Sequence, residues 1–422
     1  ASVSPQHLLI SGAGAALVAL DTFTLNANRG LTLSNWMYLG VADNKALTYN
    51  GVITDGAGSY SIVKNQGGEL ILGGNNAYDG GTYIDNGTLT LKHASAAGTG
   101  GIYVGRESGS DPATLNIGAG ITAGNALTIR AGSSGVKTLR AAETATLSGA
   151  LAIAETGDDR FTIDVANGKS LTLSGVVSGD SGGGKITKAG AGTVVFSNTG
   201  NTHDKKVLIN AGTVAISASR NLGADPGGAY ADKITLNGGT LRATASFALN
   251  PYYSTTLGAN NGFIEVDNGY TLTYPAAISG SGGFGKTGAG TLLLTGANTF
   301  SGKMTNSAGT VQIGSGGTLG SVTADIVNNA ALVWNRSDDV TYAGVISGTG
   351  TLTKNGAGTL TLSGVSGMSG NTTVSAGTLL VSGSLANSAG TGGSGATLMG
   401  DGPAGNLTGG GTVDPGNSGG AR

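Results

Sequence analysis

A six-residue phrase, Lys-x-Gly-Ala-Gly-Thr followed by a short apolar run, recurs along this 422-residue chain. Complete copies begin at Lys188, Lys286 and Lys354, and a degenerate copy begins at Lys64. A second glycine that starts a strand follows each phrase at a nearly constant distance, at Gly87, Gly212, Gly309 and Gly377. A period of roughly 20 residues with one strand per phrase is typical of a solenoid, in which each coil stacks on the next.

The phrase sits inside a larger unit of about three coils, which adds a Leu-Thr strand and a Val/Ile-Ser-Gly strand upstream. This unit occurs near residues 51–93, 171–216, 272–313 and 341–382. The strands are short apolar-polar-apolar runs, such as Leu171-Thr172-Leu173, that place alternate side chains inward. We therefore predict an all-β chain forming a single right-handed parallel β-helix over residues 1–395, with about 20 coils of roughly 20 residues and some loop insertions. Residues 396–422 are expected to be a Gly-rich terminal coil or flexible exit.

Composition narrows the class of protein further. The 80 glycines show no collagen period, and 39% hydrophobic residues argue against disorder. A net charge of −2 with only 11% charged residues predicts no nucleic-acid partner. The absence of cysteine excludes disulfides, thiol catalysis and zinc fingers. No apolar stretch reaches the ~18 residues that a membrane-spanning helix needs, so we expect no membrane insertion of this segment.

Each part of the phrase has an expected structural role. Its glycines allow a turn, and its threonine begins a strand. We expect its lysine to lie outside as a solubilising charge.

The segment Lys286 to Thr299, followed by Ala308-Gly309-Thr310-Val311, resembles the autotransporter-associated β-strand repeat of bacterial passenger domains, also called the passenger-associated transport repeat. Lys354 to Val381 is a second match, in which Val365-Ser366-Gly367 replaces the usual x-Asn-Thr. Lys188 to Ile216 departs more, with His203-Asp204-Lys205-Lys206 where small residues are typical. The resemblance implies a secreted β-helix at the bacterial cell surface, either anchored in the outer membrane or released. A C-terminal translocator barrel is then expected outside this chain.

One string is similar to a catalytic motif. Gly179-Asp180-Ser181-Gly182-Gly183 spells the nucleophile signature of chymotrypsin-like proteases, and His93 lies upstream. The same slot in other repeats holds Gly280-Ser281-Gly282-Gly283 and Gly348-Thr349-Gly350, so we interpret the string as a turn. Such short strands also cannot supply the scaffold of a protease oxyanion hole.

The titratable residues form no metal-ligand pattern. His7, His93 and His203 are far apart and are expected in loops or at the surface. Two acidic clusters, Glu155 with Asp158 and Asp159, and Asp338 with Asp339, stand beside Arg160 and Arg336. We interpret them as exposed ion pairs in solvated turns, instead of calcium or glycosidase sites. We assign no catalytic, cofactor-binding or metal-binding residue and expect no cofactor.

Four aromatic residues are candidates for stacking on sugars: Trp36, Trp334, Tyr252 and Tyr253. The alternative, that they cap coils or fill corners, is favoured for each.

The function expected from these features is that of a structural stalk or adhesin in cell–cell or cell–matrix adhesion, as in biofilm or autoaggregation. Its partners would be further copies of itself, or host and matrix glycans and proteins. The first alternative is an extracellular homopolymeric filament that stacks through open β-helix ends, where Leu8-Leu9-Ile10 with Leu17-Val18-Ala19 could cover one end or stack on a neighbour. The second alternative is a secreted glycan- or protein-cleaving enzyme carried on the β-helix.

Overall fold

The computed structural model describes residues 4–10, 12–157, 160–179, 184–400, 402–403, 405 and 407–414. These residues form 48 strands and a single short 3-10 helix at Ser219–Leu222. The described strand pairings are parallel, and the strands build a parallel β-solenoid of about 17 turns. The predicted fold class is therefore confirmed. No helix among the described residues has the length and apolar character needed to cross a membrane.

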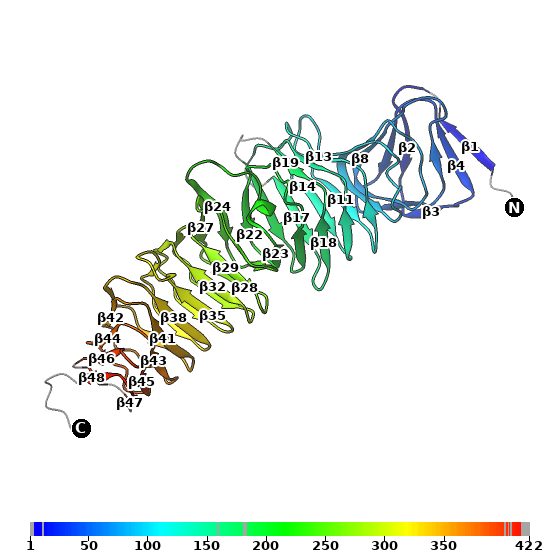
Figure 1. The fold of residues 1–422 in the computed structure, drawn as a ribbon. Coiled ribbons are helices and arrows are strands. Elements are labelled where there is room, and N and C mark those ends of the chain that lie inside the picture. Colours follow the sequence, from blue (N-terminus) through cyan, green and yellow to red (C-terminus); the bar gives the residue numbers. More distant parts are fainter. Residues whose placement is uncertain are drawn as a thin grey trace. The chain divides into compact units, whose positions relative to one another are not determined.

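The chain divides into two compact units, whose residues the colour bar of Figure 1 locates. The first comprises Ala1–Ala215 with Arg220–Asp225, and the second comprises Ile216–Ser219 with Pro226–Arg422.

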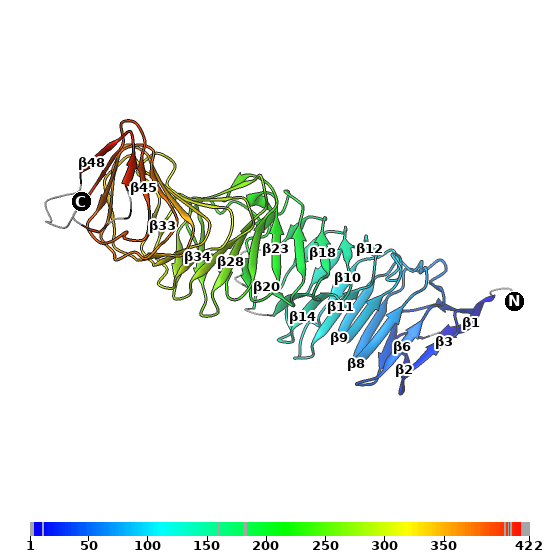
Figure 2. The ribbon, with the colours of Figure 1, turned by 90° about the horizontal axis from the view of Figure 1, so that it is seen from below.

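Unit 1 carries strands in three columns, and each strand pairs with its equivalent in the next coil (Figure 2). The first column is β2 (Ala15–Ala19), β5 (Met37–Val41), β8 (Ile62–Leu72), β9 (Thr82–Leu91), β10 (Ile102–Val104), β13 (Leu127–Ile129), β16 (Leu151–Ile153) and β19 (Val177–Ser178). The second is β3 (Phe23–Leu25), β6 (Ala46–Tyr49), β8, β9, β11 (Ala113–Ile117), β14 (Lys137–Ala141), β17 (Phe161–Val165), β20 (Lys185–Ala189) and β22 (Lys206–Ile209). The third is β12 (Thr122–Ala123), β15 (Ala145–Leu147), β18 (Ser170–Leu173) and β21 (Thr193–Phe196).

The N-terminal strand β1 (Ser4–Ile10) pairs with β4 (Arg29–Leu33), which pairs with β7 (Ile53–Thr54). The segment Leu8-Leu9-Ile10 is therefore placed on the edge of β4.

Unit 2 also consists of columns of parallel strands, several of which are labelled in Figure 1. One column is β25 (Thr240–Ala243), β28 (Gly262–Val266), β31 (Phe284–Thr287), β34 (Met304–Asn306), β37 (Ile326–Asn328) and β40 (Ile346–Ser347). A second is β26 (Phe247–Ala248), β29 (Thr271–Tyr274), β32 (Thr291–Leu294), β35 (Thr310–Ile313), β38 (Ala331–Asn335), β41 (Thr351–Asn355), β43 (Thr372–Val374), β45 (Gly390–Gly392) and β47 (Leu407–Gly409). A third is β39 (Val340–Tyr342), β42 (Thr359–Leu362), β44 (Thr378–Val381), β46 (Thr397–Met399) and β48 (Thr412–Asp414).

Three further strands, β24 (Tyr230–Leu236), β27 (Tyr253–Leu257) and β30 (Ile278–Gly280), form another pairing series in unit 2. Regular pairing continues to β47 and β48, inside the Gly-rich stretch that begins at residue 396.

Ladders of apolar side chains fill the interior of both units. In unit 1 the register aligns buried side chains through successive coils, at Leu47, Leu70, Leu89, Leu115, Leu139 and Ile163. In unit 2 the corresponding ladder is Leu272, Leu292, Val311, Leu332 and Leu352. Full burial of such a side chain stabilises the folded state by about 1.5–3 kcal/mol. Because each side chain of a ladder packs against its equivalents in the adjacent coils, this stability comes from contacts between neighbouring coils.

The length of the coils explains why about 17 turns form where about 20 were predicted. One line of equivalent positions in unit 1 runs through Met37, Ile62, Thr82, Ile102, Leu127, Leu151 and Val177. Most of these steps are longer than the period of roughly 20 residues that the phrase predicts. In unit 2 the equivalent positions Phe284, Met304, Ile326 and Ile346 keep close to that period. Longer loops in unit 1 therefore lower the number of turns that the chain can make.

Candidate functional site

The lysine of each repeated phrase is buried, so the expectation of an exposed solubilising charge was wrong. Lys64, Lys188, Lys286 and Lys354 are at most 1% exposed. Lys286 Nζ donates to the carbonyl oxygens of Thr287 at 2.8 Å, Gly288 at 2.8 Å and Ala308 at 3.0 Å. The three donors of one ammonium group thus satisfy two carbonyls of the adjoining turn and one carbonyl of the next coil.

The other copies repeat this geometry. Lys188 Nζ bonds the carbonyl oxygens of Ala189, Gly190 and Ala211 at 2.5, 2.7 and 3.2 Å. Lys354 Nζ bonds those of Asn355, Gly356 and Ala376 at 2.9, 2.9 and 3.2 Å. The degenerate copy keeps two bonds, from Lys64 Nζ to Gln66 and Asn86. Buried carbonyls require donors, which gives the physical reason for burying this charge.

The glycines of the phrase permit this turn. Gly288 has a φ of +72°, and Gly309 in the next coil has a φ of +69°. A Cβ at Gly309 would meet the Gly290 carbonyl oxygen at 2.3 Å. The turns of successive coils therefore approach too closely for any other residue. Burial also lowers the pKa of Lys64, Lys188 and Lys286 to about 8 and lowers that of Lys354.

A buried asparagine follows the apolar run of the phrase and joins three successive coils. Asn298 Oδ1 accepts the N–H of Ile278 in the preceding coil at 3.0 Å, and its Nδ2 donates to the Ser321 carbonyl in the next at 2.9 Å. Asn76 and Asn201 make the same two-sided contacts. In the fourth copy Ser366 Oγ accepts the Ile346 N–H at 3.1 Å. The serine noted in the sequence therefore keeps the backward contact of the asparagine.

A core side chain stands two positions after this polar residue, and this explains the placement of His203. The four copies hold Tyr78, His203, Phe300 and Met368, all at most 1% exposed. The His203 ring lies 6.5 Å from that of Phe196 between centroids. His203 was expected in a loop or at the surface; it lies outside the strands but is not at the surface, because it occupies a core site of the repeat. Alignment of the four copies would have indicated this.

Glu155 is also buried, so its interpretation as part of a solvated turn was wrong. It forms an ion pair with Lys137, and both side chains are at most 3% exposed. Lys137 Nζ donates to the Ser133 carbonyl at 2.6 Å, and Glu155 Oε1 accepts the N–H groups of Thr156 and Gly157 at 3.0 and 2.8 Å. Each buried charge is thereby compensated. Arg160 Nη1 lies 3.8 Å from Glu155 Oε1.

The remaining candidate residues have separate places. Asp158, Asp159 and the string Asp180 to Gly183 lie outside the described residues. His93 is half-buried, and its Nδ1 accepts the Ser95 N–H at 3.1 Å. Arg336 makes a two-pronged ion pair with Asp338 at 2.9 and 2.6 Å, and Asp339 accepts the Thr359 N–H at 2.6 Å. Among the described residues no three His, Asp or Glu gather as a metal site would require.

The aromatic candidates divide into two pairs. Trp334 and Tyr253 are 3% and 1% exposed and fill the interior. Trp36 and Tyr252 are 39% and 42% exposed. Trp36 packs edge-on against Tyr38, with ring centroids 5.1 Å apart and an interplanar angle of 83°.

Trp36 also lines a hollow on the outer face of unit 1, which we name the aromatic groove. Its volume is about 510 Å³, and it is lined by Asn35, Trp36, Tyr38, Ser59, Tyr60, Ser61, Val63, Tyr83, Asp85 and Arg130. Strands β5, β8 and β9 carry Tyr38, Val63, Tyr83 and Asp85, and the segments that lead into β5 and β8 carry residues 35–36 and 59–61. Parallel pairing places Tyr38, Val63, Tyr83 and Tyr103 at the same register in four successive coils. The Tyr83 and Tyr103 rings are stacked at 4.6 Å with an interplanar angle of 12°.

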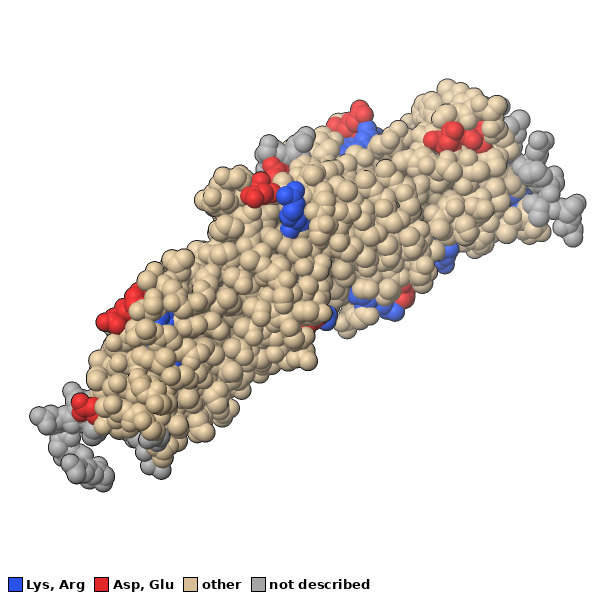
Figure 3. Space-filling view, viewed as in Figure 1, with Lys and Arg blue, Asp and Glu red and all other residues tan. Residues whose placement is uncertain are grey.

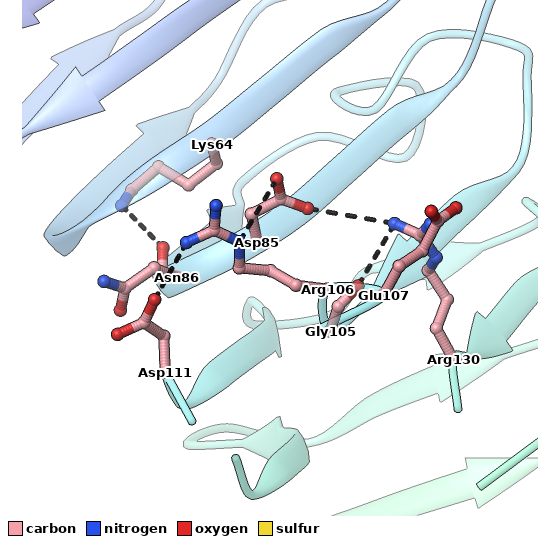
Figure 4. Close-up of polar contacts among 8 residues, drawn as sticks. All are labelled: Lys64, Asp85, Asn86, Gly105, Arg106, Glu107, Asp111 and Arg130. Carbon is pink, nitrogen blue, oxygen red and sulfur yellow. Dashed lines mark hydrogen bonds and ion pairs between the residues drawn. The ribbon is translucent and has the colours of Figure 1, made fainter. Parts of the chain in front are cut away.

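A group of five charged residues borders the groove (Figure 4). Asp85 lies between two arginines, 4.0 Å from Arg106 Nε and 3.8 Å from Arg130 Nη1. Arg106 pairs with Asp111 at 2.9 Å and Arg130 with Glu107 at 2.5 Å. Arg130 also lies over the Tyr83 ring, 5.6 Å from its centroid. Burial raises the pKa of Asp85 despite the opposing effect of both arginines.

On the face shown in Figure 3, charged residues are sparse and stand in small separate groups. Trp36 was a candidate from the sequence, whereas the tyrosines, Asp85 and Arg130 were missed. The sequence did hold one indication of the stacked tyrosines, because the separation of Tyr83 and Tyr103 along the chain equals the length of one coil.

Comparison with known proteins agrees with the repeats. Residues 62–91, 186–216, 284–313 and 352–381 match the passenger-associated-transport-repeat family. The chain is 37% identical over 184 residues to the adhesin BmaC autotransporter of Brucella suis biovar 1 (strain 1330). That alignment covers 44% of this chain and 5% of the relative, so this chain spans only a small part of the relative's length. No solved structure gives a significant match. The predicted resemblance to an autotransporter passenger with these repeats is confirmed.

Proposed function

We propose that this chain is part of an adhesive passenger displayed on, or released from, the bacterial cell surface. The observation that carries the proposal is the similarity to an autotransporter named as an adhesin, within a chain that holds four passenger-associated transport repeats. The structure supports it physically, because successive coils align short polar side chains on the outside of the strands, as at Thr88, Thr114, Thr138 and Thr162. Many weak contacts along such faces add up through multivalency. Host and matrix glycans and proteins, or further copies of the chain, are the proposed partners.

Surface display tests this proposal directly. The full 422-residue chain would be fused to an unrelated translocator in a non-adherent bacterial strain, with the empty translocator as the matched control. Adhesion to cultured cells, to matrix-coated plates and between bacteria would be counted at equal display levels. We expect the chain to raise at least one of these adhesions several-fold. Equal counts for chain and empty translocator in all three assays would overturn the proposal.

A further inference from the structure

We propose that the aromatic groove of unit 1 is a binding site for a neutral oligosaccharide, with one hexose ring over Val63 and with Tyr38 and Tyr83 at its borders. This inference rests on the proposed adhesive function, because it names the class of partner that one face of the chain takes.

The spacing of the coils creates the slot. Tyr38, Val63 and Tyr83 stand at one register position in three successive coils. Neighbouring strands are about 4.8 Å apart, so the two tyrosine positions are separated by roughly 10 Å. The small Val63 between them leaves that space open at the surface. A gap of this width accepts one pyranose ring over Val63, with Tyr38 and Tyr83 at its borders.

The size and lining of the groove fit a sugar better than an apolar peptide side chain. Its volume of about 510 Å³ lies within the range of small-ligand sites, roughly 300–1,000 Å³. Trp36 and the tyrosines offer apolar surface to the C–H faces of a sugar. Asn35, Ser59 and Asp85 line the same hollow and offer partners to hydroxyl groups. A purely aromatic or aliphatic guest would leave these polar groups without partners, which costs free energy.

The charges at the border favour a neutral ligand. Two arginines face three carboxylates, Asp85, Glu107 and Asp111, so the group carries 2 − 3 = −1. Both guanidinium groups are already engaged by these carboxylates, and Arg130 is also held over Tyr83. No surplus positive charge is left in this group to attract a sialic or uronic acid.

The test is binding of sugars to the full chain by titration calorimetry and tryptophan fluorescence. The neutral probes are cellopentaose, laminaripentaose and N-acetylchitopentaose, and the acidic probes are sialyllactose and pentagalacturonate. We expect at least one neutral probe to bind with micromolar to millimolar affinity and to change the fluorescence of Trp36. Trp334, which is buried in unit 2, serves as the internal reference, and Trp334→Phe confirms the assignment.

Three variants locate the site. Trp36→Ala and Tyr83→Ala remove stacking surface, and Val63→Trp fills the slot while leaving every polar group in place. Each should weaken binding at least tenfold, whereas Tyr83→Phe keeps the ring and should bind within about threefold. Tyr270→Ala removes a similarly exposed aromatic residue of unit 2 and is the matched control. Circular dichroism melts establish that each variant is folded.

Several results would overturn the inference: no neutral probe binding at millimolar concentration, binding of acidic probes alone, or unchanged binding by Val63→Trp. Displaying the Val63→Trp variant in the adhesion assay separates the two proposals. If wild type and variant adhere equally and no probe binds, the groove assignment fails and the adhesive function stands. If the probe binds at the groove but no adhesion occurs, the adhesive function fails and the groove assignment stands.

Discussion

The Nζ atom of Lys286 lies 3.0 Å from the carbonyl oxygen of Ala308, a residue of the next coil. With its bonds to Thr287 and Gly288, this ammonium group satisfies three carbonyl oxygens belonging to two successive turns. Lys188 and Lys354 have the same arrangement. The lysine of the repeat therefore links successive coils through hydrogen bonds.

Replacing this lysine should destabilise unit 2. Lys286→Met keeps the length of the side chain but leaves three carbonyl groups without their donor, and each such loss costs about 1–3 kcal/mol. We expect the free energy of unfolding to fall by about 2–5 kcal/mol in urea titrations followed by circular dichroism. The control is Lys45→Met, because Lys45 forms an exposed pair with Asp21 and should change stability by under about 1 kcal/mol. Equal stability of the two variants would contradict the proposal that Lys286 stabilises the stacking of coils.

The same residue should give the protein a measurable pH dependence. Burial lowers the pKa of Lys286 from 10.5 to about 8, so between these values the unfolded chain binds a proton that the folded chain lacks. Stability contributed through this group should therefore rise with pH across that window and be constant below about pH 8. The measurement is the stability difference between wild type and Lys286→Met from about pH 7 to 11, in which the titration of other groups cancels. A difference that falls with pH in this window would contradict the lowered pKa.

Replacing Asn298 should lower the free energy of unfolding more than replacing its counterpart Ser366. Asn298→Ala removes contacts to the preceding and the following coil, whereas Ser366→Ala removes the backward contact to Ile346. With about 1 kcal/mol per hydrogen bond and more for any buried group left unpaired, we expect losses of about 2–4 and about 1–2 kcal/mol. Thermal and urea unfolding of both variants would measure the order. The interpretation would be wrong if the serine variant were the less stable of the two.

The buried pair Lys137–Glu155 offers a test by double substitution. Glu155→Leu alone leaves an uncompensated buried ammonium and should cost about 3–5 kcal/mol. Adding Lys137→Met removes that charge, so the double variant should recover much of the lost stability. A double-mutant cycle on urea unfolding measures the coupling directly. Additive losses would indicate that the two residues act independently.

The period of the Lys-Gly-Ala-Gly-Thr phrase was sufficient to predict the parallel β-solenoid and the repeat family. It could not give the number of turns, because the longer coils of unit 1, such as those from Ile102 to Val177, carry no phrase of their own. The burial of Lys286 and Glu155 was missed because charged side chains are nearly always solvated, and the exceptions depend on partners that only the fold supplies.

The aromatic groove was missed for a related reason. The stretch of chain from Tyr38 to Val63 is longer than the stretch from Val63 to Tyr83, although each makes one coil. Only the strand register shows that these unequal spacings bring the three residues into one line. Trp36 was found in the sequence because tryptophan is rare and conspicuous by itself, without any knowledge of the register.

Ala308, whose carbonyl oxygen accepts a hydrogen bond from Lys286, lies 22 residues later in the chain, in the next coil. Until that coil has folded, the ammonium group of Lys286 lacks one of its three hydrogen-bond acceptors. We expect each coil that folds to supply the missing acceptor of the coil before it. Folding of one coil then stabilises its neighbour, and a terminal coil without a neighbour is the least stable part of the molecule.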